Sequence, residues 1–524
     1  MRDLHLPGRS AVWADNGLCA TSHPTAANAA LDILKAGGNA MDAAIAGAVA
    51  LGVCEPAMCG LAGDCFALVK PAGQDQVLSY NGSGRAPAGA SAAALRAEGL
   101  SQMPDRDARS VTVPGAVAAF EEMSALWGKL GLADSLAPAI QLFETGVPVH
   151  ARVAFDFATS ASRLDATAAR HLMPTGQPPK EGARFALPGQ AEVLRRIARD
   201  GARAFYEGEV AEDMLAALRQ GGGAHEAADF AAQKGMQTDP ISGAYKGATL
   251  HEHPPNGQGA TAILMLNILS HFDLSALDPF GAERAHLEAE AAKLAYAARN
   301  RFIADAAQAE GDRMLDPALA AELAARIDPA RAQPEGAAFD GTPHRDTVYI
   351  TVVDRDRMAV SLIYSVFHAF GSGLGTEKFG LVLHNRGMGF TLTEGHGNEL
   401  APGKRPMHTI IPGMLAENGT PNLPFGVMGG QYQAAGHARF VTNLRDYGLS
   451  PQAAIDAPRA FPEGGALQLE RGYAPEVAAA LEAKGHRVTI PDTPIGGAQA
   501  IRIHDSGVLE GGSDPRKDGC AIGY

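Results

Sequence analysis

The junction between Asp346 and Thr347 is the place in this chain where a strong nucleophile could be made. Residues 331–346 are rich in proline, glycine and mixed charge, and the run TVYITVV that follows predicts a buried strand. A threonine hydroxyl is a poor nucleophile unless a base lies close by, and the α-amine of an N-terminal threonine can be that base. Such an amine titrates near pH ~7.7–8.0, so it can take up and return a proton. Cleavage at 346/347 would create this residue; a threonine that merely begins a strand is the local alternative.

The elements around this junction indicate a layered fold of helices and strands. TVYITVV, the turn DRDR and the run MAVSLIYSVF together predict a β-hairpin. Alanine-rich, almost wholly apolar sequence predicts buried helices at 24–35 and 39–51, and a long helix at 285–301. Another short strand is expected at 381–384. The mixed order of helices and strands predicts an α+β fold.

Composition restricts the classes of function. The chain has 524 residues, 46% of them hydrophobic, which is typical of a folded globular protein. Its net charge of −14 disfavours nucleic acid and anionic membranes as partners. The N-terminus lacks the apolar core of a secretory signal, and the longest apolar stretch, 43–53, is too short to span a bilayer. We therefore expect a cytoplasmic protein.

The sequence gives little support for a metal or a cofactor. The five cysteines are an odd number in a large chain, which favours reduced thiols. Cys54, Cys59 and Cys65 lack any CxxC pair, so small apolar packing is the better interpretation. His251 and His253 could be read as metal ligands, but a structural or solvent role is favoured. We expect neither a cofactor nor a metal.

Motifs that keep a fixed order run through nearly the whole chain, from about residue 17 to residue 524. They are SHPTAANAALDILKAGGNAMDAAIA (22–46), VPGAVAAF (113–120), PAIQLFETGVPV (138–149), DGARAFYEGEVA (200–211), HPPNGQG (253–259), PGKRPMHT (402–409), MGG (428–430), DYGLSPQAAIDAPR (446–459) and SDPR (513–516). Together they resemble the γ-glutamyltranspeptidase family of N-terminal-nucleophile hydrolases.

The resemblance implies a four-layer αββα sandwich made from one precursor. The precursor would be cut into residues 1–346 and 347–524, which together form one αββα unit. Thr347 matches the family's nucleophile, and Gly429 and Gly430 match the glycine pair whose backbone N–H groups form the oxyanion hole. Ser365 falls where the family places a second threonine that hydrogen-bonds the nucleophile, and a serine keeps the hydroxyl.

Other positions depart from the family pattern, and these departures concern the substrate. Ser83 stands where the family's carboxylate-binding arginine is expected, with Arg85 two residues later. Gly389 stands where the lid carries an acid for the substrate's α-amino group, and Phe367 replaces an asparagine. An ammonium without a carboxylate partner is poorly held, so the γ-glutamyl head group is disfavoured.

A small acid could still be bound. Arg85 or Arg386 could supply the cation, and His408 and Thr409 occupy the family's substrate-binding serine pair. The variant motifs GRAP (84–87), FGSG (370–373) and NRG (385–387) resemble the cytoplasmic transpeptidase-like branch that includes oxamate amidohydrolase. We therefore predict a self-processing amide hydrolase or acyl transferase acting on a small carboxylate amide, with its own two subunits as partners and further dimerisation left open. The alternatives are a γ-glutamyl hydrolase of glutathione-like compounds and an uncut, non-catalytic binding protein.

Overall fold

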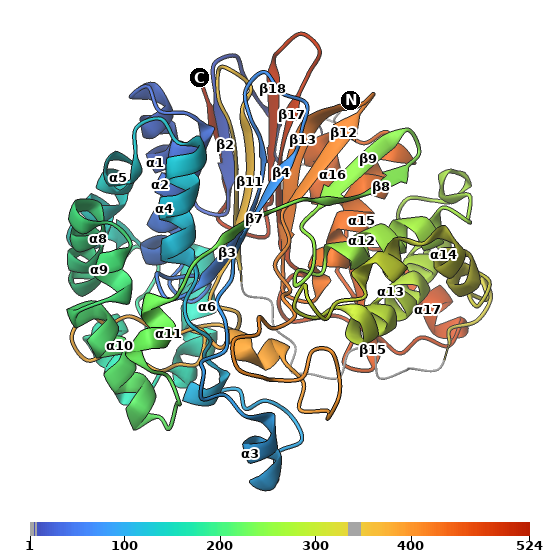
Figure 1. Cartoon of the computed structure of the whole chain (residues 1–524). Helices are drawn as coiled ribbons and strands as arrows, with labels where there is room; N and C mark the ends of the chain where they lie inside the picture. Colours follow the sequence, from blue (N-terminus) through green and yellow to red (C-terminus); the bar gives the residue numbers. More distant parts are fainter. Residues whose placement is uncertain (1–4, 6–7, 334–346) are drawn as a thin grey trace.

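The computed structural model describes residue 5 and residues 8–333 and 347–524. Two seven-stranded antiparallel sheets face each other at the centre, and helices cover the outer face of each sheet (Figure 1). Apolar side chains fill the space between the sheets and each space between a sheet and its helices. The expected four-layer αββα sandwich is confirmed.

The first sheet, here sheet I, has the order β19-β2-β10-β11-β3-β4-β7. The predicted hairpin lies at its centre as β10 and β11, joined by a tight turn at Asp354–Arg357. Dense β-branched and aromatic content suits a strand that is buried on both faces. The strands are β2 (Leu18–Thr21), β3 (Asp64–Lys70), β4 (Leu78–Gly82), β7 (Met236–Thr238), β10 (Val348–Val353), β11 (Ala359–Ser365) and β19 (Cys520–Gly523).

The second sheet, sheet II, has the order β1-β18-β17-β13-β12-β9-β8. Both sheets contain strands from either side of position 346/347, so neither sheet is complete without both parts of the chain. The strands of sheet II are β1 (Val12–Ala14), β8 (Ile241–Tyr245), β9 (Ala248–Glu252), β12 (Gly413–Glu417), β13 (Thr420–Met428), β17 (Gly497–Ile503) and β18 (Leu509–Ser513).

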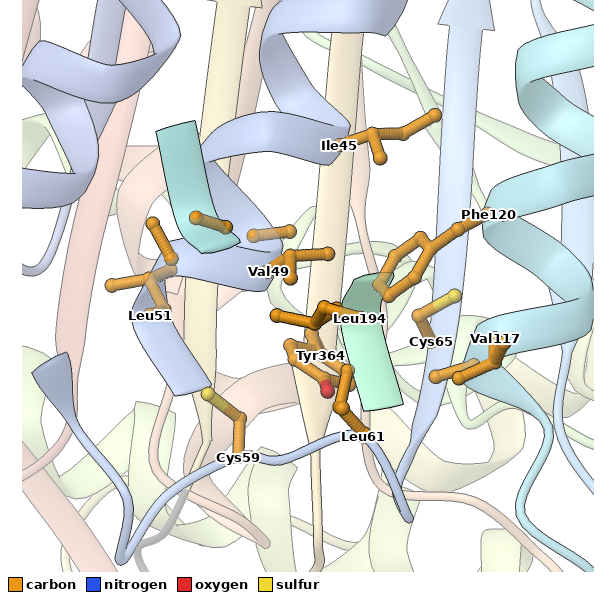
Figure 2. Close-up of a cluster of buried hydrophobic side chains, with 14 of the residues drawn as sticks. Ile45, Val49, Leu51, Cys59, Leu61, Cys65, Val117, Phe120, Leu194 and Tyr364 are labelled. Carbon is orange, nitrogen blue, oxygen red and sulfur yellow. The ribbon is translucent and has the colours of Figure 1, made fainter. Parts of the chain in front are cut away.

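The helices over sheet I surround one central apolar helix. All residues of α2 are buried, and a capping box at Asn39 fixes its start. Figure 2 shows this core, where Cys59 and Cys65 pack among leucine, valine and aromatic side chains. The helices on this side are α1 (Pro24–Lys35), α2 (Ala40–Cys54), α4 (Ala116–Trp127), α5 (Leu132–Thr145), α6 (Ala151–Ser160), α7 (Ala166–Leu172), α8 (Pro188–Asp200), α9 (Arg203–Tyr206), α10 (Glu209–Gln220) and α11 (Ala227–Ala231).

The helices over sheet II pack around α12 and α15. In the described part of the chain, no helix combines the length and apolarity needed to cross a bilayer. These helices are α12 (Gly259–Leu269), α13 (Ala282–Phe302), α14 (Pro317–Ala324), α15 (Tyr432–Arg445), α16 (Pro451–Asp456) and α17 (Pro475–Ala483). Outside the layers lie α3 (Ala92–Ala97), a small sheet of β14 (Ala460–Glu463), β15 (Ala466–Leu469) and β16 (Val488–Thr489), and the pair β5 (Val147–Pro148) and β6 (Arg184–Phe185).

The prediction of a strand at 381–384 is wrong. This stretch makes only an isolated bridge between Gly375 and Val382. Leu381 and Leu383 are buried in the core beside the sheet I helices, so their alternation imitates a strand pattern. Their backbones instead close a local loop, in which the Leu383 N–H donates to the Leu374 carbonyl at 3.0 Å.

Candidate active site

Three polar residues lie in a row at one end of sheet I. Val348 pairs with Tyr364, so Thr347 stands opposite Ser365, and Ser365 in turn pairs with Asp64 on β3. Residues directly opposite one another point to the same face of a sheet. Thr347 and Asp64 are two strand spacings apart, or about 10 Å. The strand pairing therefore brings the proposed nucleophile close to a carboxylate that is distant in sequence.

The row faces sheet II, in the layer between the two sheets. The next residues on the same faces of their strands, Tyr349, Ile363 and Phe66, form a buried cluster with Met428 of β13. Gly426 permits this close approach, because a Cβ there would lie 2.3 Å from the Tyr349 ring. The end of β13 is thereby held against the end of β10.

The Thr347 hydroxyl lies between two polar side chains. It donates to Ser365 Oγ at 3.4 Å and accepts from Gln433 Nε2 at 3.4 Å. Ser365 Oγ also accepts the Phe367 backbone N–H at 2.8 Å. Thr347, Ser365 and Gln433 are fully buried. The structure thus places Ser365 within hydrogen-bond distance of Thr347, the proposed nucleophile.

The glycine pair lies in the turn between β13 and α15. Gly429 and Gly430 have φ values of +123° and +57°, a region that favours glycine. A Cβ on Gly429 would also lie 2.8 Å from Gly496 Cα. Gln433, in the first turn of α15, reaches Thr347, so the turn and the hydroxyl lie side by side. Backbone N–H groups at such a helix start suit a developing oxyanion.

Asp64 is the centre of a buried charge cluster. Its Oδ1 accepts the backbone N–H groups of Gly84 and Gly115 at 3.1 and 3.0 Å. Its Oδ2 lies 3.2 Å from His408 Nε2 and 3.5 Å from His384 Nδ1. Burial alone would raise the pKa of Asp64, but the neighbouring histidines and a buried arginine outweigh burial and lower it. Asp64 is therefore an anion at neutral pH.

The arginine in this cluster is Arg386, which is fully buried in the short 3₁₀ helix Arg386–Gly389. Its Nη1 donates to Thr409 Oγ1 at 3.1 Å, and its Nε lies 4.0 Å from Asp64 Oδ2. Its guanidinium carbon lies 4.2 Å from the centre of the Phe367 ring. Nε and Nη2 have no hydrogen-bond partner among the described residues. Burial lowers the pKa of Arg386 to about 9, so it is still cationic at neutral pH.

His408 adds a second buried nitrogen without a hydrogen-bond partner in the described parts of the chain, its Nδ1. Burial and the nearby Arg386 lower the pKa of His408 to about 3, so the ring is neutral at pH 7. With Nε2 directed at the Asp64 carboxylate, Nε2 carries the proton and Nδ1 is an acceptor. An anion could therefore accept hydrogen bonds from Nε and Nη2 of Arg386, whereas Nδ1 of the neutral His408 could only accept one from a donor.

Two sets of contacts link this cluster to the surroundings of Thr347. Phe367 donates its N–H to Ser365 and places its ring on Arg386. Gln258 Nε2 donates to the Thr409 carbonyl at 2.6 Å and lies 3.5 Å from the Gly430 carbonyl. Phe367 thus connects the Arg386 guanidinium with Ser365, which lies beside Thr347, and Gln258 connects Thr409 with the glycine turn.

Arg85 is placed apart from this cluster. Its side chain is 47% exposed, and Nη1 donates to the Gly403 carbonyl at 2.8 Å and lies 3.5 Å from Asp305. It therefore fastens one surface loop to another. Ser83 is buried and donates its hydroxyl to Asn81 Oδ1 at 2.6 Å, so it belongs to a neighbouring amide network.

Gly389 has no space for a side chain. A Cβ there would lie 2.2 Å from the Met407 carbonyl oxygen and 3.1 Å from Pro406 Cβ. An acid at this position would therefore require the backbone to move. Asp346, the other half of the proposed scissile bond, lies outside the described residues.

Sequence reasoning missed Asp64, His384 and Gln433. Asp64 opens an apolar strand in the run DCFALVK, and a charged residue at a buried strand end is the one local signal for it. His384 and Gln433 stand in a loop and a helix without any distinctive spacing. Only the three-dimensional arrangement brings them to the site.

Residues of the types that bind metals lie close together at another place, in the helical layer over sheet II. Ligand atoms of His286, Glu290 and His486 lie within 4.8 Å of one another. His286 Nδ1 hydrogen-bonds His486 Nε2 at 2.8 Å, and Glu290 pairs with Lys293 at 2.7 Å. Two nitrogens bound to one tetrahedral zinc would stand ~3.3 Å apart, so this cluster is better described as a hydrogen-bonded pair and an ion pair. The earlier candidates His251 and His253 lie on and after β9, and His253 stacks on Phe66 with ring centres 4.0 Å apart.

Comparisons with known proteins cover nearly the whole chain. The Gamma-glutamyltranspeptidase family model matches residues 26–524. The chain is 36% identical to the glutathione hydrolase-like YwrD proenzyme of Bacillus subtilis, covering 96% of this chain and 97% of the relative. It is 34% identical to the oxamate amidohydrolase proenzyme of Klebsiella pneumoniae, covering 97% and 98%. The solved cephalosporin acylase of Bacillus halodurans superposes with a TM-score of 0.93 at 38% identity, covering 100% and 98%.

Proposed function

Because the chain belongs to the γ-glutamyltranspeptidase family of N-terminal-nucleophile hydrolases, we propose that Thr347 is freed by self-cleavage and then hydrolyses the amide of a small carboxylic acid, with oxamate as the simplest substrate. The enzyme class follows from the family, whereas the substrate is inferred from the site. The observation that supports this choice of substrate is the buried Arg386, whose Nε and Nη2 lack hydrogen-bond partners among the described residues.

Self-cleavage needs only the chain and one water. The Thr347 hydroxyl attacks the carbonyl carbon of residue 346, and the peptide C–N bond breaks as the acyl group moves to Oγ1. The hydroxyl proton passes to the nitrogen, which becomes the α-amine of Thr347. Water then hydrolyses the ester, leaving a carboxylate on residue 346 and a free hydroxyl on Thr347. The products are residues 1–346 and 347–524.

Turnover repeats this chemistry on an external amide. The α-amine of Thr347 takes the hydroxyl proton, and Oγ1 attacks the substrate carbonyl. The N–H groups of Gly429 and Gly430 stabilise the oxyanion. The amine then protonates the departing nitrogen, which leaves as ammonia or an amine. Water, activated by the same amine, resolves the ester; an amine acceptor in place of water would give acyl transfer.

The head group is recognised by the cluster around Asp64. A carboxylate can accept two parallel N–H bonds from Nε and Nη2 of Arg386, the arrangement that the guanidinium geometry favours. Thr409 holds Nη1 of the same guanidinium, and Phe367 covers one of its faces. Phe367 links Arg386 to Ser365, which lies beside Thr347, and on this basis we propose a short acyl group between carboxylate and amide.

A γ-glutamyl group fits this site less well. Its α-ammonium needs an anion, and Asp64 already accepts two backbone N–H groups and faces two histidines. Gly389 leaves no space for another acid. Cleavage of γ-glutamyl compounds is nevertheless the second candidate, because the relative at 36% identity is named glutathione hydrolase-like.

A substrate panel on processed wild-type protein separates the candidates. Ammonia release would be measured with oxamate and its longer homologues malonamate and succinamate, and product release with glutathione and γ-glutamyl-p-nitroanilide. We expect kcat/KM to be highest for a short carboxylate amide. If γ-glutamyl compounds are better substrates by orders of magnitude, the proposed head group is wrong. A stable, uncut and inert chain would instead indicate a binding protein.

A further inference from the structure

We infer that Gln433 is a further catalytic residue, whose side-chain amide donates a hydrogen bond to the nucleophilic oxygen of Thr347. This inference rests on the proposed function of Thr347. Gln433 Nε2 lies 3.4 Å from Thr347 Oγ1, and the Gln433 side chain is fully buried. It lies in the first turn of α15, where its backbone N–H donates to the Gly430 carbonyl at 3.3 Å.

The orientation of the Gln433 amide follows from its second contact. Its Oε1 accepts the Ile411 backbone N–H at 3.0 Å, and only the carbonyl end of the amide can accept. The NH₂ end must therefore face Thr347. An NH₂ group has no acceptor capacity, so at Thr347 it can only donate. In the opposite orientation two N–H groups would meet in a buried place.

A donor at this position has a direct consequence for the nucleophile. It occupies one lone pair of Oγ1 and leaves the hydroxyl proton directed to Ser365 Oγ or to the base. As the proton leaves, negative charge develops on Oγ1, and the bond from Gln433 becomes charge-assisted and stronger. An interaction that strengthens only toward the transition state raises kcat rather than substrate affinity.

The same donor acts in both halves of the reaction. Oγ1 is the attacking atom when the acyl-enzyme forms and the leaving atom when water breaks the ester. Charge develops on Oγ1 in each transition state, as it does during self-cleavage. The start of α15 therefore provides two sets of donors: the backbone of Gly429 and Gly430 for the substrate oxygen, and Gln433 for the enzyme oxygen.

The test compares three variants with wild type. Gln433→Leu keeps the size and removes the donor. Gln433→Glu keeps the shape and replaces the donor with a group that donates only when protonated. Gln190→Leu is the matched control, since Gln190 is a buried glutamine that donates to the Gly380 carbonyl at 2.8 Å, in the helical layer over sheet I. Thermal melting within a few degrees of the control shows that each variant is folded.

We expect Gln433→Leu to slow self-cleavage and to lower kcat on the best substrate of the panel by about 10–100-fold, the effect of losing one hydrogen bond to a charged group. KM should stay within about threefold, because the bond acts on the transition state. For Gln433→Glu, activity relative to wild type at the same pH should rise as the pH falls and the carboxyl becomes protonated. A purely structural role would give no such pH-dependent ratio.

The outcomes are distinct. If wild type is processed and active but Gln433→Leu matches Gln190→Leu in kcat and in cleavage rate, Gln433 is not catalytic and the proposed function stands. A folded Gln433→Leu chain that stays uncut supports the inference if Gln433→Glu cleaves faster at low pH, and overturns it if Gln433→Glu cleaves at the wild-type rate at every pH. If wild type is neither cut nor active, the proposed function fails and this inference fails with it.

Discussion

The two halves of the candidate site differ in how their polar groups are used. In the nucleophile half, Thr347 donates to Ser365 at the end of the neighbouring strand and accepts from Gln433 of α15. In the recognition half, around Asp64, the buried Arg386 and His408 keep nitrogens without hydrogen-bond partners among the described residues.

This difference has a physical meaning. An unpaired buried donor typically costs ~1–3 kcal/mol, so a guanidinium with two of them is stable only where the surrounding fold holds it in place. Functional sites are where such unsatisfied groups are expected. We therefore propose that the nucleophile half carries out the chemistry and that the recognition half selects the acyl group.

The largest effect should come from the nucleophile half. We expect Thr347→Ala to give a single uncut chain without measurable activity, because the same hydroxyl serves cleavage and turnover. Thr347→Ser should still cleave, more slowly. SDS gels and the substrate panel check both variants. Two bands from Thr347→Ala would remove Thr347 from the mechanism.

The glycine turn should be the next most sensitive position. Gly430 has φ +57°, so Gly430→Ala is strained and should shift the proposed oxyanion donors. Loss of one such donor typically costs about 100–1000-fold in kcat. Steady-state kinetics on processed protein measure this. Near-normal turnover would show that the oxyanion hole lies elsewhere.

Substitutions in the recognition half should change KM. Arg386→Met should raise KM for the short carboxylate amide by about 10–100-fold, the effect of a charged hydrogen bond, and Arg386→Lys should restore it only in part. Arg85→Ala is the control, since its guanidinium fastens a surface loop, and should change KM by no more than about twofold. A larger effect from Arg85 than from Arg386 would reverse our assignment.

A smaller effect should appear in the pH dependence of stability. The pKa of His408 is about 3 in the folded protein, mainly because of burial, against an ordinary value of 6.5. The unfolded chain therefore binds a proton below pH 6.5 that the folded chain does not. The contribution of His408 to the free energy of unfolding is complete above pH 6.5 and is lost as the pH falls toward 3. One such proton contributes at most about 1.4 kcal/mol per pH unit.

Urea unfolding between pH 7.5 and pH 5 measures this contribution. Thr347→Ala as background keeps the chain uncut, and adding His408→Gln should make the free energy of unfolding fall less steeply with decreasing pH. Because His23 and His253 are also buried with pKa values of about 3, the background slope contains their contributions too, and only the difference between the two variants belongs to His408. Equal slopes would show that His408 is not held neutral by burial.

The nucleophile half was accessible from sequence because its signals are local. Thr347 stands at the boundary between a polar, proline- and glycine-rich stretch and a β-branched strand, and the hairpin register then places Ser365 beside it. Helices with strong caps or uniform apolar sequence, such as α1 and α2, were also predicted with good boundaries.

The recognition half was less accessible because it is assembled from distant segments. Asp64, His384 and Arg386 meet only when β3 lies beside β11 and the loop after β11 folds back over it. From sequence, Arg85 and Arg386 were both candidates for binding the substrate's carboxylate. The structure distinguishes them because Arg386 is buried and Arg85 is exposed. Strand β13 was also not predicted, since Pro421, Pro424 and Gly426 weaken its pattern.

The most direct test of the central claim is the intact mass of purified wild-type protein together with N-terminal sequencing of each polypeptide in it. We predict two polypeptides that copurify, one of which corresponds to residues 347–524 and begins with Thr347. A single uncut chain, or a second polypeptide that begins at any other residue, would contradict the account.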